Sequence, residues 1–436
     1  MSLRRTAAVI AAAAVTALAL APAARSQDEA RAVPTTDASD AAAGWLARQL
    51  VDGDHFLYPG TTSPDQGSTL DALFAFTAAG VASDSADKAL AWLARPEVIA
   101  NYLHFDDPAE SFAGSYAKLA LAVQVRGGDP SDFGGEDLIA GLTALQAPSG
   151  RFVNKSQYGD FSNGFSQAFA VLALDRAQGA PRAAVDYLVG QQCGDGGFPL
   201  ILEATPCVSH VDATSMAVQA LVAVGDTAAA GEALDWLEGV QQPGGGFRDE
   251  GATDAGNANS TGLAAQALRA GGRTATADLA VRFLTSLQVG CTAAEADRGA
   301  IAFDATGFQQ TSSLRASAQG VLGLVGVGFG DLTADGGTPG TPVLDCPATT
   351  TSSTAATTTS TDTTTTTGTD ATTTTTDASV TATTTTAAVV AVTANRGNLA
   401  RTGADVGPAL WVGALLLVGG VLTVLLSRKR YADARK

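Results

Sequence analysis

The feature that most constrains the fold is a pattern that recurs six times between residues 38 and 330, at intervals of 46 to 49 residues. Each unit has an aromatic residue or a glycine followed by leucine, and these pairs begin at Trp45, Trp92, Gly141, Tyr187, Trp236 and Phe283. In the last four units a glutamine follows shortly after, namely Gln146, Gln192, Gln241 and Gln288. A phenylalanine then closes a polar or glycine-rich turn in every unit, at Phe56, Phe105, Phe152, Phe198, Phe247 and Phe303. A fixed period of this length indicates a repeat architecture in which neighbouring units share one core.

Each unit is predicted to hold two helices joined by this turn. In 233–240 the apolar residues fall at the i, i+3, i+4 and i+7 spacing of an amphipathic helix. The second helix is rich in alanine on most faces, as in 214–221 and 261–268, so we expect it to be the more buried of the two. Six units therefore predict twelve helices in an all-α fold.

Two architectures fit six helical hairpins, an open α-solenoid and a closed (α/α)6 toroid. Solenoids have atypical, polar terminal units. Here the first and last units carry the same pattern as the others. The sequence therefore predicts a closed toroid over residues 36–346.

The repeat resembles that of the terpenoid cyclase and protein prenyltransferase family, in its squalene-cyclase form. That repeat has an aromatic–Leu pair, a Gln, a short glycine turn and a second aromatic, and Trp236, Leu237, Gln241 and Phe247 match it. The first two units lack the glutamine, and Phe stands where the family often has Trp. The resemblance covers roughly residues 38 to 330 and implies the toroid. Because the same fold also serves transcobalamin-like binders and complement-type thioester domains, it implies no single activity.

The N-terminus has the layout of a secretory signal peptide over residues 1–26. Arg4 and Arg5 precede an apolar run at 7–21, and small residues that offer cleavage after Ala23 or Ser26 follow it. The alternative is an uncleaved anchor. The sequence therefore predicts an exported protein.

The C-terminal segment 399–436 carries three features in a fixed order. The pentapeptide Leu399, Ala400, Arg401, Thr402 and Gly403 comes first. An uncharged run at 406–426, long enough to span a bilayer, and a basic tail follow it. This order resembles an LPxTG-type cell-wall sorting signal in the LAxTG variant of high-GC actinobacteria. The resemblance implies that a sortase cleaves after Thr402 and joins it to peptidoglycan; the alternative is a single-pass membrane protein.

A stalk of low complexity is predicted between the toroid and this signal, at 347–396. Between Thr349 and Thr393, 25 of the 45 residues are threonine. No apolar periodicity is present there, so no core can offset the entropy of ordering the chain. The segment is expected to be a disordered spacer, with or without O-glycosylation.

Charge and cysteine content narrow the partners further. Between residues 27 and 346 there are 38 acidic and 16 basic residues, and the basic ones form no stripe, so nucleic acid is an unsuitable partner. Four cysteines in an exported chain indicate disulfides and allow three pairings. We favour Cys193–Cys207, within one inter-helix loop, and Cys291–Cys346, which ties the end of the domain to the last unit.

The motif with the strongest link to chemistry lies in the fourth unit. Squalene-cyclase-like enzymes protonate an alkene with a D-x-D-D-T-A acid at the start of an inner helix, and His210, Val211, Asp212, Ala213 and Thr214 stand at the matching place. Only the middle aspartate is retained, so the resemblance makes Asp212 a weak candidate acid. The alternative is that Asp212 caps the helix. Zinc binding would need Cys207 as a thiolate, which a disulfide excludes, and we expect no metal and no cofactor.

A ring of polar residues is expected at one mouth of the toroid, where the second helices begin. Aligning these helices gives one column with Asp65, Glu110, Phe161, His210, Asn257 and about Gln310, and another with Gly67, Phe112, Asn163, Asp212, Asn259 and about Ser312. The candidate ligand-binding residues are Asp65, Glu110, Asn163, His210, Asp212, Asn257 and Asn259. They are either helix caps alone or a site for the polar head of an amphiphilic ligand.

These features predict a secreted, cell-wall-anchored surface protein that displays a non-catalytic α/α-toroid binding domain. Its expected partners are sortase, peptidoglycan through Thr402, the membrane before sortase cleavage, and an amphiphilic small ligand or another surface molecule. The alternative is an extracellular terpene-cyclase- or prenyltransferase-like enzyme with Asp212 as its acid. A purely structural spacer is the third possibility, favoured if side chains fill the centre of the ring.

Overall fold

The computed structural model describes residues 33–248 and 255–347. The predicted signal peptide, stalk, sorting pentapeptide and span at 406–426 lie outside these residues. Within the described ranges, no helix is long and apolar enough to cross a membrane. Thirteen α-helices make up most of this part of the chain.

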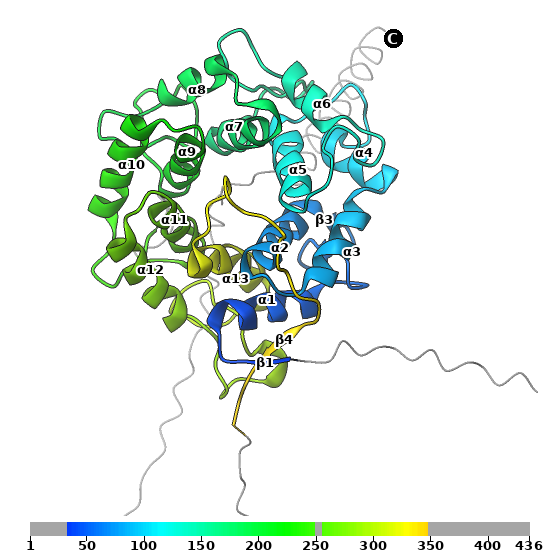
Figure 1. Cartoon of the computed structure of the whole chain (residues 1–436), viewed down its shortest axis with the longest axis vertical. Coiled ribbons are helices and arrows are strands. Elements are labelled where there is room, and N and C mark those ends of the chain that lie inside the picture. Colours follow the sequence, from blue (N-terminus) through cyan, green and yellow to red (C-terminus); the bar gives the residue numbers. More distant parts are fainter. Residues whose placement is uncertain (1–32, 249–254, 348–436) are drawn as a thin grey trace, which may run out of the picture.

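Six helices form a closed inner ring (Figure 1). Each packs against the next along the chain, and the last packs against the first. These inner helices are α2 (Gln66–Ala79), α5 (Ala113–Val125), α7 (Gly164–Gln178), α9 (Val211–Ala223), α11 (Ala258–Ala270) and α13 (Gln310–Val325). The contact between α13 and α2 closes the ring, so the toroid rather than the solenoid is observed.

The remaining helices surround this ring. They are α1 (Ala38–Gln49), α3 (Ser83–Leu93), α4 (Pro96–His104), α6 (Leu138–Ala144), α8 (Arg182–Val189), α10 (Thr227–Val240) and α12 (Thr274–Ser286). The described residues hold one helix more than the twelve expected, because the second unit has both α3 and α4. Pro96 stands at the first position of α4, where proline favours a new helix start.

Two short sheets and one 3₁₀ helix complete the described elements. β1 (Val33–Thr35) pairs in parallel with β4 (Pro342–Leu344), and β2 (Phe56–Leu57) pairs antiparallel with β3 (Pro64–Asp65). The 3₁₀ helix η1 spans Glu295–Asp297. The β1–β4 pair joins the two ends of the described chain.

Small residues let the inner helices approach closely, as their alanine content predicts. The tightest contact involves Gly262 on α11, where an added methyl group would lie 2.2 Å from the carbonyl oxygen of Gln319 on α13. Glycine is therefore required at this crossing. The inner helices are consequently buried on most faces, as expected.

The inner helices are fastened to the turns by one repeated hydrogen bond. A side chain in the second turn of the inner helix, or in the third turn of α13, accepts the N–H of the turn residue at 2.8 to 3.0 Å. The pairs are Thr69 with Phe56, Gln167 with Phe152, Thr214 with Phe198, Thr261 with Phe247 and Ser317 with Ile301. The expectation that Phe303 closes the sixth turn was therefore wrong, because η1 lengthens that loop and Ile301 takes the place.

The second unit departs from this scheme. Tyr116 holds the equivalent position on α5, and its hydroxyl contacts Nε2 of His104 at 3.2 Å. His104 ends α4, the additional helix of this unit. The predicted turn residue, Phe105, instead caps the C-terminus of α4 in a left-handed conformation.

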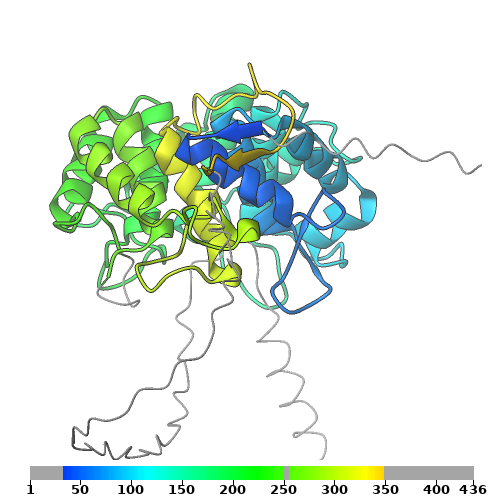
Figure 2. The ribbon, with the colours of Figure 1, turned by 90° about the horizontal axis from the view of Figure 1, so that it is seen from below.

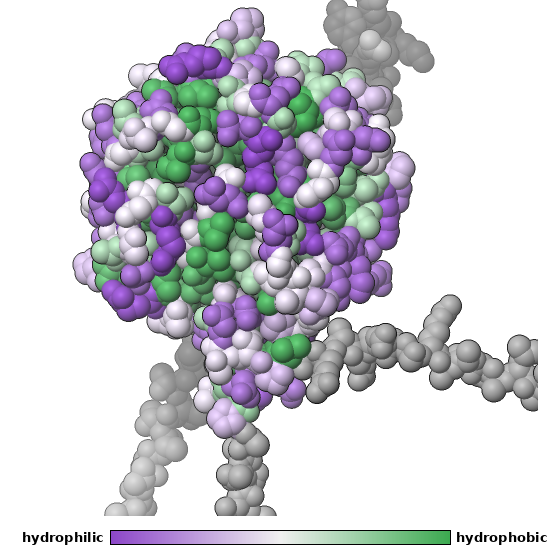
Figure 3. Space-filling view, viewed as in Figure 1, coloured by the Kyte–Doolittle hydropathy of each residue, from purple (hydrophilic) through white to green (hydrophobic). Residues whose placement is uncertain are grey.

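One face of the ring is closed by the chain that follows α13. Residues 326–341 cross the centre of the ring, and side chains cover this centre in the space-filling view (Figures 1 and 3). Seen from the side, this segment and β1 lie along one face, while the loops that precede the inner helices lie along the other (Figure 2). The inner helices therefore begin at the face opposite the crossing segment.

Candidate functional site at the centre of the ring

The turn contacts reveal which inner-helix residues face the centre. A side chain that bonds an outer turn points outward, and residues two positions before and after it lie about 200° around the helix. The layer nearest the helix N-termini therefore holds Gly67, Gly114, Phe165, Asp212, Asn259 and Arg315. The second layer holds Asp71, Lys118, Phe169, Met216, Leu263 and Gln319.

Five of the six inner helices carry a single charged residue, and on four of them this residue occupies a centre-facing position; the fifth, Arg269 on α11, pairs with Asp278 on α12. The four centre-facing residues are Asp71 on α2, Lys118 on α5, Asp212 on α9 and Arg315 on α13. Lys118 is only 1% exposed, and its Nζ lies 2.6 Å from Oδ1 of Asp71 and donates to the Gly67 carbonyl at 3.0 Å. This bridge between α2 and α5 satisfies a charge that would otherwise be costly to bury.

The far end of the centre is filled by Phe329. Its ring is 5.0 Å from that of Phe74 on α2 and 5.8 Å from that of Phe169 on α7, measured between centroids. Its N–H donates to Oε1 of Gln219 at 3.0 Å, and its carbonyl accepts from Nη1 of Arg176 at 3.1 Å. The crossing segment is thus hydrogen-bonded to the inner helices and closes this end.

The opposite end remains in contact with solvent. The Asp71 side chain is 16% exposed although it faces the centre, and Arg315 and Gln319 are half-buried. Because the Phe329 end is closed, water reaches these side chains from the mouth where the inner helices begin. Contact with solvent is confined to the mouth itself, because Lys118, Phe169, Met216 and Leu263 of the second layer are at most 4% exposed.

Four of the predicted ligand-binding residues are helix caps. Asp65, Asn163 and Asn257 accept the N–H of the third helical residue at 2.9, 3.2 and 2.9 Å. His210 caps α9, with Nδ1 accepting the N–H of Asp212 at 3.2 Å. The expectation that Asp212 is the cap was wrong, because His210 already holds that position.

The structure shifts the alignment of three of the six inner helices. Phe112 and Asn163 are the N-caps of α5 and α7, so Glu110 and Phe161 lie two residues before these N-caps. Glu110 is 2% exposed and belongs to the preceding loop, where its Oε1 accepts the N–H of Gln157 at 3.1 Å. In α13, Arg315 rather than Ser312 is equivalent to Asp212, because Ser317 makes the turn contact.

Asp212 and Asn259 are the predicted residues that face the centre. Both are buried, and Asn259 is 5% exposed. Oδ1 of Asn259 has no hydrogen-bond partner among the described residues. Sequence reasoning missed their companions Arg315, Lys118 and Asp71, although a single charge inside an alanine-rich helix was a signal that could have found them.

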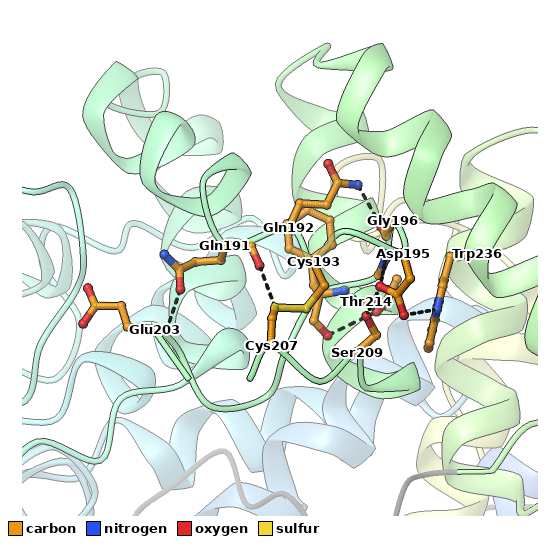
Figure 4. Close-up of a disulfide and its surroundings, with 12 residues drawn as sticks. Gln191, Gln192, Cys193, Asp195, Gly196, Glu203, Cys207, Ser209, Thr214 and Trp236 are labelled. Atoms are coloured by element: carbon orange, nitrogen blue, oxygen red, sulfur yellow. Dashed lines mark hydrogen bonds between the residues drawn. A yellow bond between two sulfur atoms is a disulfide. The ribbon is translucent and has the colours of Figure 1, made fainter. Parts of the chain in front are cut away.

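The rim of the open mouth is held rigidly at the loop between α8 and α9. The predicted disulfides Cys193–Cys207 and Cys291–Cys346 are both present, and the first staples this loop (Figure 4). Beside it, Asp195 accepts hydrogen bonds from Oγ of Ser209 at 2.5 Å and from Nε1 of Trp236 at 3.0 Å. Burial raises the pKa of Asp195, but hydrogen bonds from Ser209, the Gly197 N–H and Trp236 outweigh it and hold this pKa below its usual value.

An ion-pair cluster joins this loop to the preceding one. Arg151 lies 2.9 Å from Asp160 and 3.1 Å from Glu203, and Glu203 also accepts from the Tyr187 hydroxyl at 3.0 Å. Burial, together with the hydrogen bond to Glu203, raises the pKa of Tyr187 to about 12. Tyr187 therefore remains a hydrogen-bond donor at physiological pH.

Among the described residues, neither the cavity nor any metal-binding cluster brings the predicted site residues together. A cavity of about 1100 Å³ lies between the ends of α5, α6 and α7, and none of the predicted residues lines it. Within 33–248 and 255–347, no group of three or more His, Cys, Asp or Glu side chains is arranged to hold a metal ion.

The comparisons with known proteins concern the fold. No protein-family model matches the chain, and no curated protein sequence matches it. Among solved structures, a protein from Actinoplanes is similar at 17% identity, with a TM-score of 0.51, over 66% of this chain and 97% of its own. The type II terpene cyclase MstE from Scytonema is similar at 14% identity and a TM-score of 0.47, over 66% and 96%. An α-amylase from Clostridium perfringens is 8% identical, with a TM-score of 0.49, over 67% and 98%. At these identities each likeness concerns the fold alone.

Proposed function

We propose that this protein is a non-catalytic binding domain, displayed on the cell surface, whose ligand enters the ring centre from the open mouth. The observation that carries the proposal is a set of polar side chains at this mouth. Asp212, Asn259 and Arg315 face the ring axis there, and Phe329 closes the opposite end. Convergent polar groups above apolar side chains are typical of a small-ligand site.

The lining fits binding better than alkene cyclisation. Protonating an alkene creates a carbocation, which aromatic faces stabilise and positive charges destabilise. The Lys118 ammonium and the Arg315 guanidinium both face the centre, whereas Phe165 and Phe169 are the aromatic residues of its two upper layers. This charge pattern favours a polar or ionic ligand group.

Surface display rests on the sequence outside the described residues. An export signal, a threonine-rich spacer and the pentapeptide ending in Thr402 and Gly403 support covalent attachment to peptidoglycan through a sortase. The two disulfides are consistent with an oxidising, extracellular compartment.

A second candidate is a cyclase-like enzyme with Asp212 as its acid. One observation favours it: Asp212 is buried and centre-facing in the first turn of α9. A desolvated carboxyl group can retain a proton at neutral pH. The neighbouring acids of the D-x-D-D motif are replaced here by His210 and Ala213.

Native mass spectrometry of the protein isolated from its own host tests the proposal. A bound small molecule that is lost from Asp212→Asn and Asn259→Ala, with both variants folded, supports the binding role. Incubation with squalene and with prenyl diphosphates addresses the alternative. Any product that forms with the parent protein and disappears with Asp212→Asn would replace the binding role by the enzymatic one.

A further inference from the structure

We propose that a groove on the face that the crossing segment closes binds a neutral oligosaccharide. The groove lies between the C-terminal ends of α5 and α7 and the helix α6, which packs outside both of them (Figure 1). We call it the α6 groove, and its lining includes Asp129, Pro130, Asp137, Ile139, Arg176 and Gln178. It is separate from the mouth where the inner helices begin, so this inference goes beyond the function proposed for the mouth.

The α6 groove is accessible to a ligand from solvent. Asp129, Asp137 and Gln178 are exposed, and Ile139 and Arg176 are half-buried. Pockets for small ligands usually enclose about 300–1,000 Å³, so a cavity of about 1100 Å³ has room for more than one sugar ring. An exposed groove also suits a segment of a longer glycan, because both ends of the bound segment can leave it.

Two carboxylates at the groove are fixed in place and each keeps one oxygen for a ligand. Oδ1 of Asp137 accepts the N–H of Ala140 at 2.8 Å and so caps α6. Oδ1 of Asp129 accepts from Oγ and from the N–H of Ser131, at 2.7 and 2.9 Å. These two hydrogen bonds hold the pKa of Asp129 below its usual value, so this carboxylate is ionised at neutral pH. In the part of the chain that the structure describes, Oδ2 of neither aspartate receives a hydrogen bond, and both oxygens are therefore available as acceptors.

The hydrogen-bond donors of the groove come from the end of α7. Nη1 of Arg176 donates to the carbonyls of Phe329 and Gly330 at 3.1 and 2.8 Å, so the crossing segment holds this guanidinium in place. Its other N–H groups, like the side-chain amide of Gln178, form no hydrogen bond with the residues described here. The groove therefore offers both donors and acceptors to a ligand.

This mixture of groups favours hydroxyls over ions. The guanidinium of Arg176 would oppose a cationic ligand, and the carboxylates of Asp129 and Asp137 would oppose an anionic one. A hydroxyl both donates and accepts, so neighbouring hydroxyls of one sugar can donate to a carboxylate and accept from a guanidinium. Such charge-assisted hydrogen bonds are stronger than neutral ones. The apolar side chains of Pro130 and Ile139 can contact the C–H faces of a sugar ring.

Saturation-transfer NMR of the full chain with six trisaccharides tests this groove. Four probes are neutral, namely maltotriose, cellotriose, mannotriose and triacetylchitotriose. Two are charged, namely chitotriose, which carries amines, and trigalacturonate, which carries carboxylates. We expect at least one neutral trisaccharide to bind, and both charged ones to bind at least about fivefold more weakly than it does. The preferred neutral probe then identifies the arrangement of ring hydroxyls that the groove takes.

Matched variants locate the binding. Asp137→Ser retains one oxygen to cap α6 and leaves none for a ligand, so it should weaken binding of the preferred sugar by about fivefold to tenfold. Ala140 is exposed and lines the groove, so Ala140→Trp should fill the groove and abolish binding. Asp37→Ser is the control, because Asp37 likewise caps a helix, α1, and lies outside the groove. It should change the affinity less than about twofold, and circular dichroism shows whether each variant is folded.

Three results would overturn the proposal. The first is no binding of any neutral trisaccharide up to about 10 mM. The second is binding of chitotriose or trigalacturonate as strong as that of the best neutral sugar. The third is unchanged affinity in folded Asp137→Ser and Ala140→Trp variants. Because the groove and the mouth lie at opposite ends of the inner helices, each of these results would leave the function proposed for the mouth intact.

Discussion

Replacing Phe329 by alanine should destabilise the toroid more than any other single change in the crossing segment. The Phe329 side chain is 2% exposed and contacts Phe74 and Phe169, which belong to helices far apart in the sequence. Truncating a fully buried phenylalanine typically costs about 3–5 kcal/mol, from lost apolar transfer and from the cavity left behind. The upper half of this range applies if the toroid cannot collapse into the space that the side chain leaves. We expect this, because six packed helices surround that space.

The assay is urea or guanidinium denaturation of Phe329→Ala against the parent protein. Val327→Ala is the matched control, because Val327 lies in the same segment and is exposed, so it should cost less than about 0.5 kcal/mol. Phe329→Leu retains much of the apolar contact and should fall between the two. A loss below about 1 kcal/mol for Phe329→Ala would refute the inference that this ring fills the centre.

Four further predictions follow from the same contacts and from the sequence. Lys118→Met should cost about 3–5 kcal/mol of unfolding free energy, because it leaves the carboxylate of Asp71 unpaired in the ring. The double variant Lys118→Met with Asp71→Leu should regain most of this free energy. Equal losses in the single and the double variant would contradict the buried bridge. The pKa of Asp195 is held below its unfolded value, so its stabilising contribution is present above about pH 4 and is lost as the pH falls through the folded pKa. The difference in unfolding free energy between the parent protein and Asp195→Asn should therefore shrink between about pH 5 and pH 3. A difference that grows over this range would contradict the prediction. Thiol titration of the denatured, unreduced protein should find none of the four cysteines free, whereas two or more free thiols would count against both bridges. Thr402→Ala should release the protein from the wall fraction into membrane or medium, and unchanged covalent attachment would exclude the sorting signal.

The repeat was readable from the sequence because its signals are local. The aromatic–Leu pairs mark the outer helices, and glycine turns separate them from the alanine-rich inner ones. The caps were readable for the same reason, since Asp65 and Asn257 directly precede helical runs. Helix α4 was not predicted, because its short pattern after Pro96 adds a helix inside a unit that otherwise keeps the period.

The centre of the ring was harder to predict, because it depends on the rotation of each helix. An error of two positions turns a side chain by about 200°, from the outer turn to the centre. Sequence alignment placed Ser312 in the column of Asp212, since α13 begins one turn earlier than the other inner helices. The long-range contact between Ser317 and Ile301 fixes the rotation and brings Arg315 to the centre.

The two ends of the described chain lie side by side along α1. β1 pairs with β4, and Arg48 on α1 donates to the Pro342 carbonyl at 2.9 Å. The Cys291–Cys346 bridge then ties the chain after β4 to the loop between α12 and α13. Under the proposed anchoring, tension applied after Pro347 would pass through this bridge to that loop. Residues 326–341, which close the ring, lie between α13 and the bridge, so they would be spared this load.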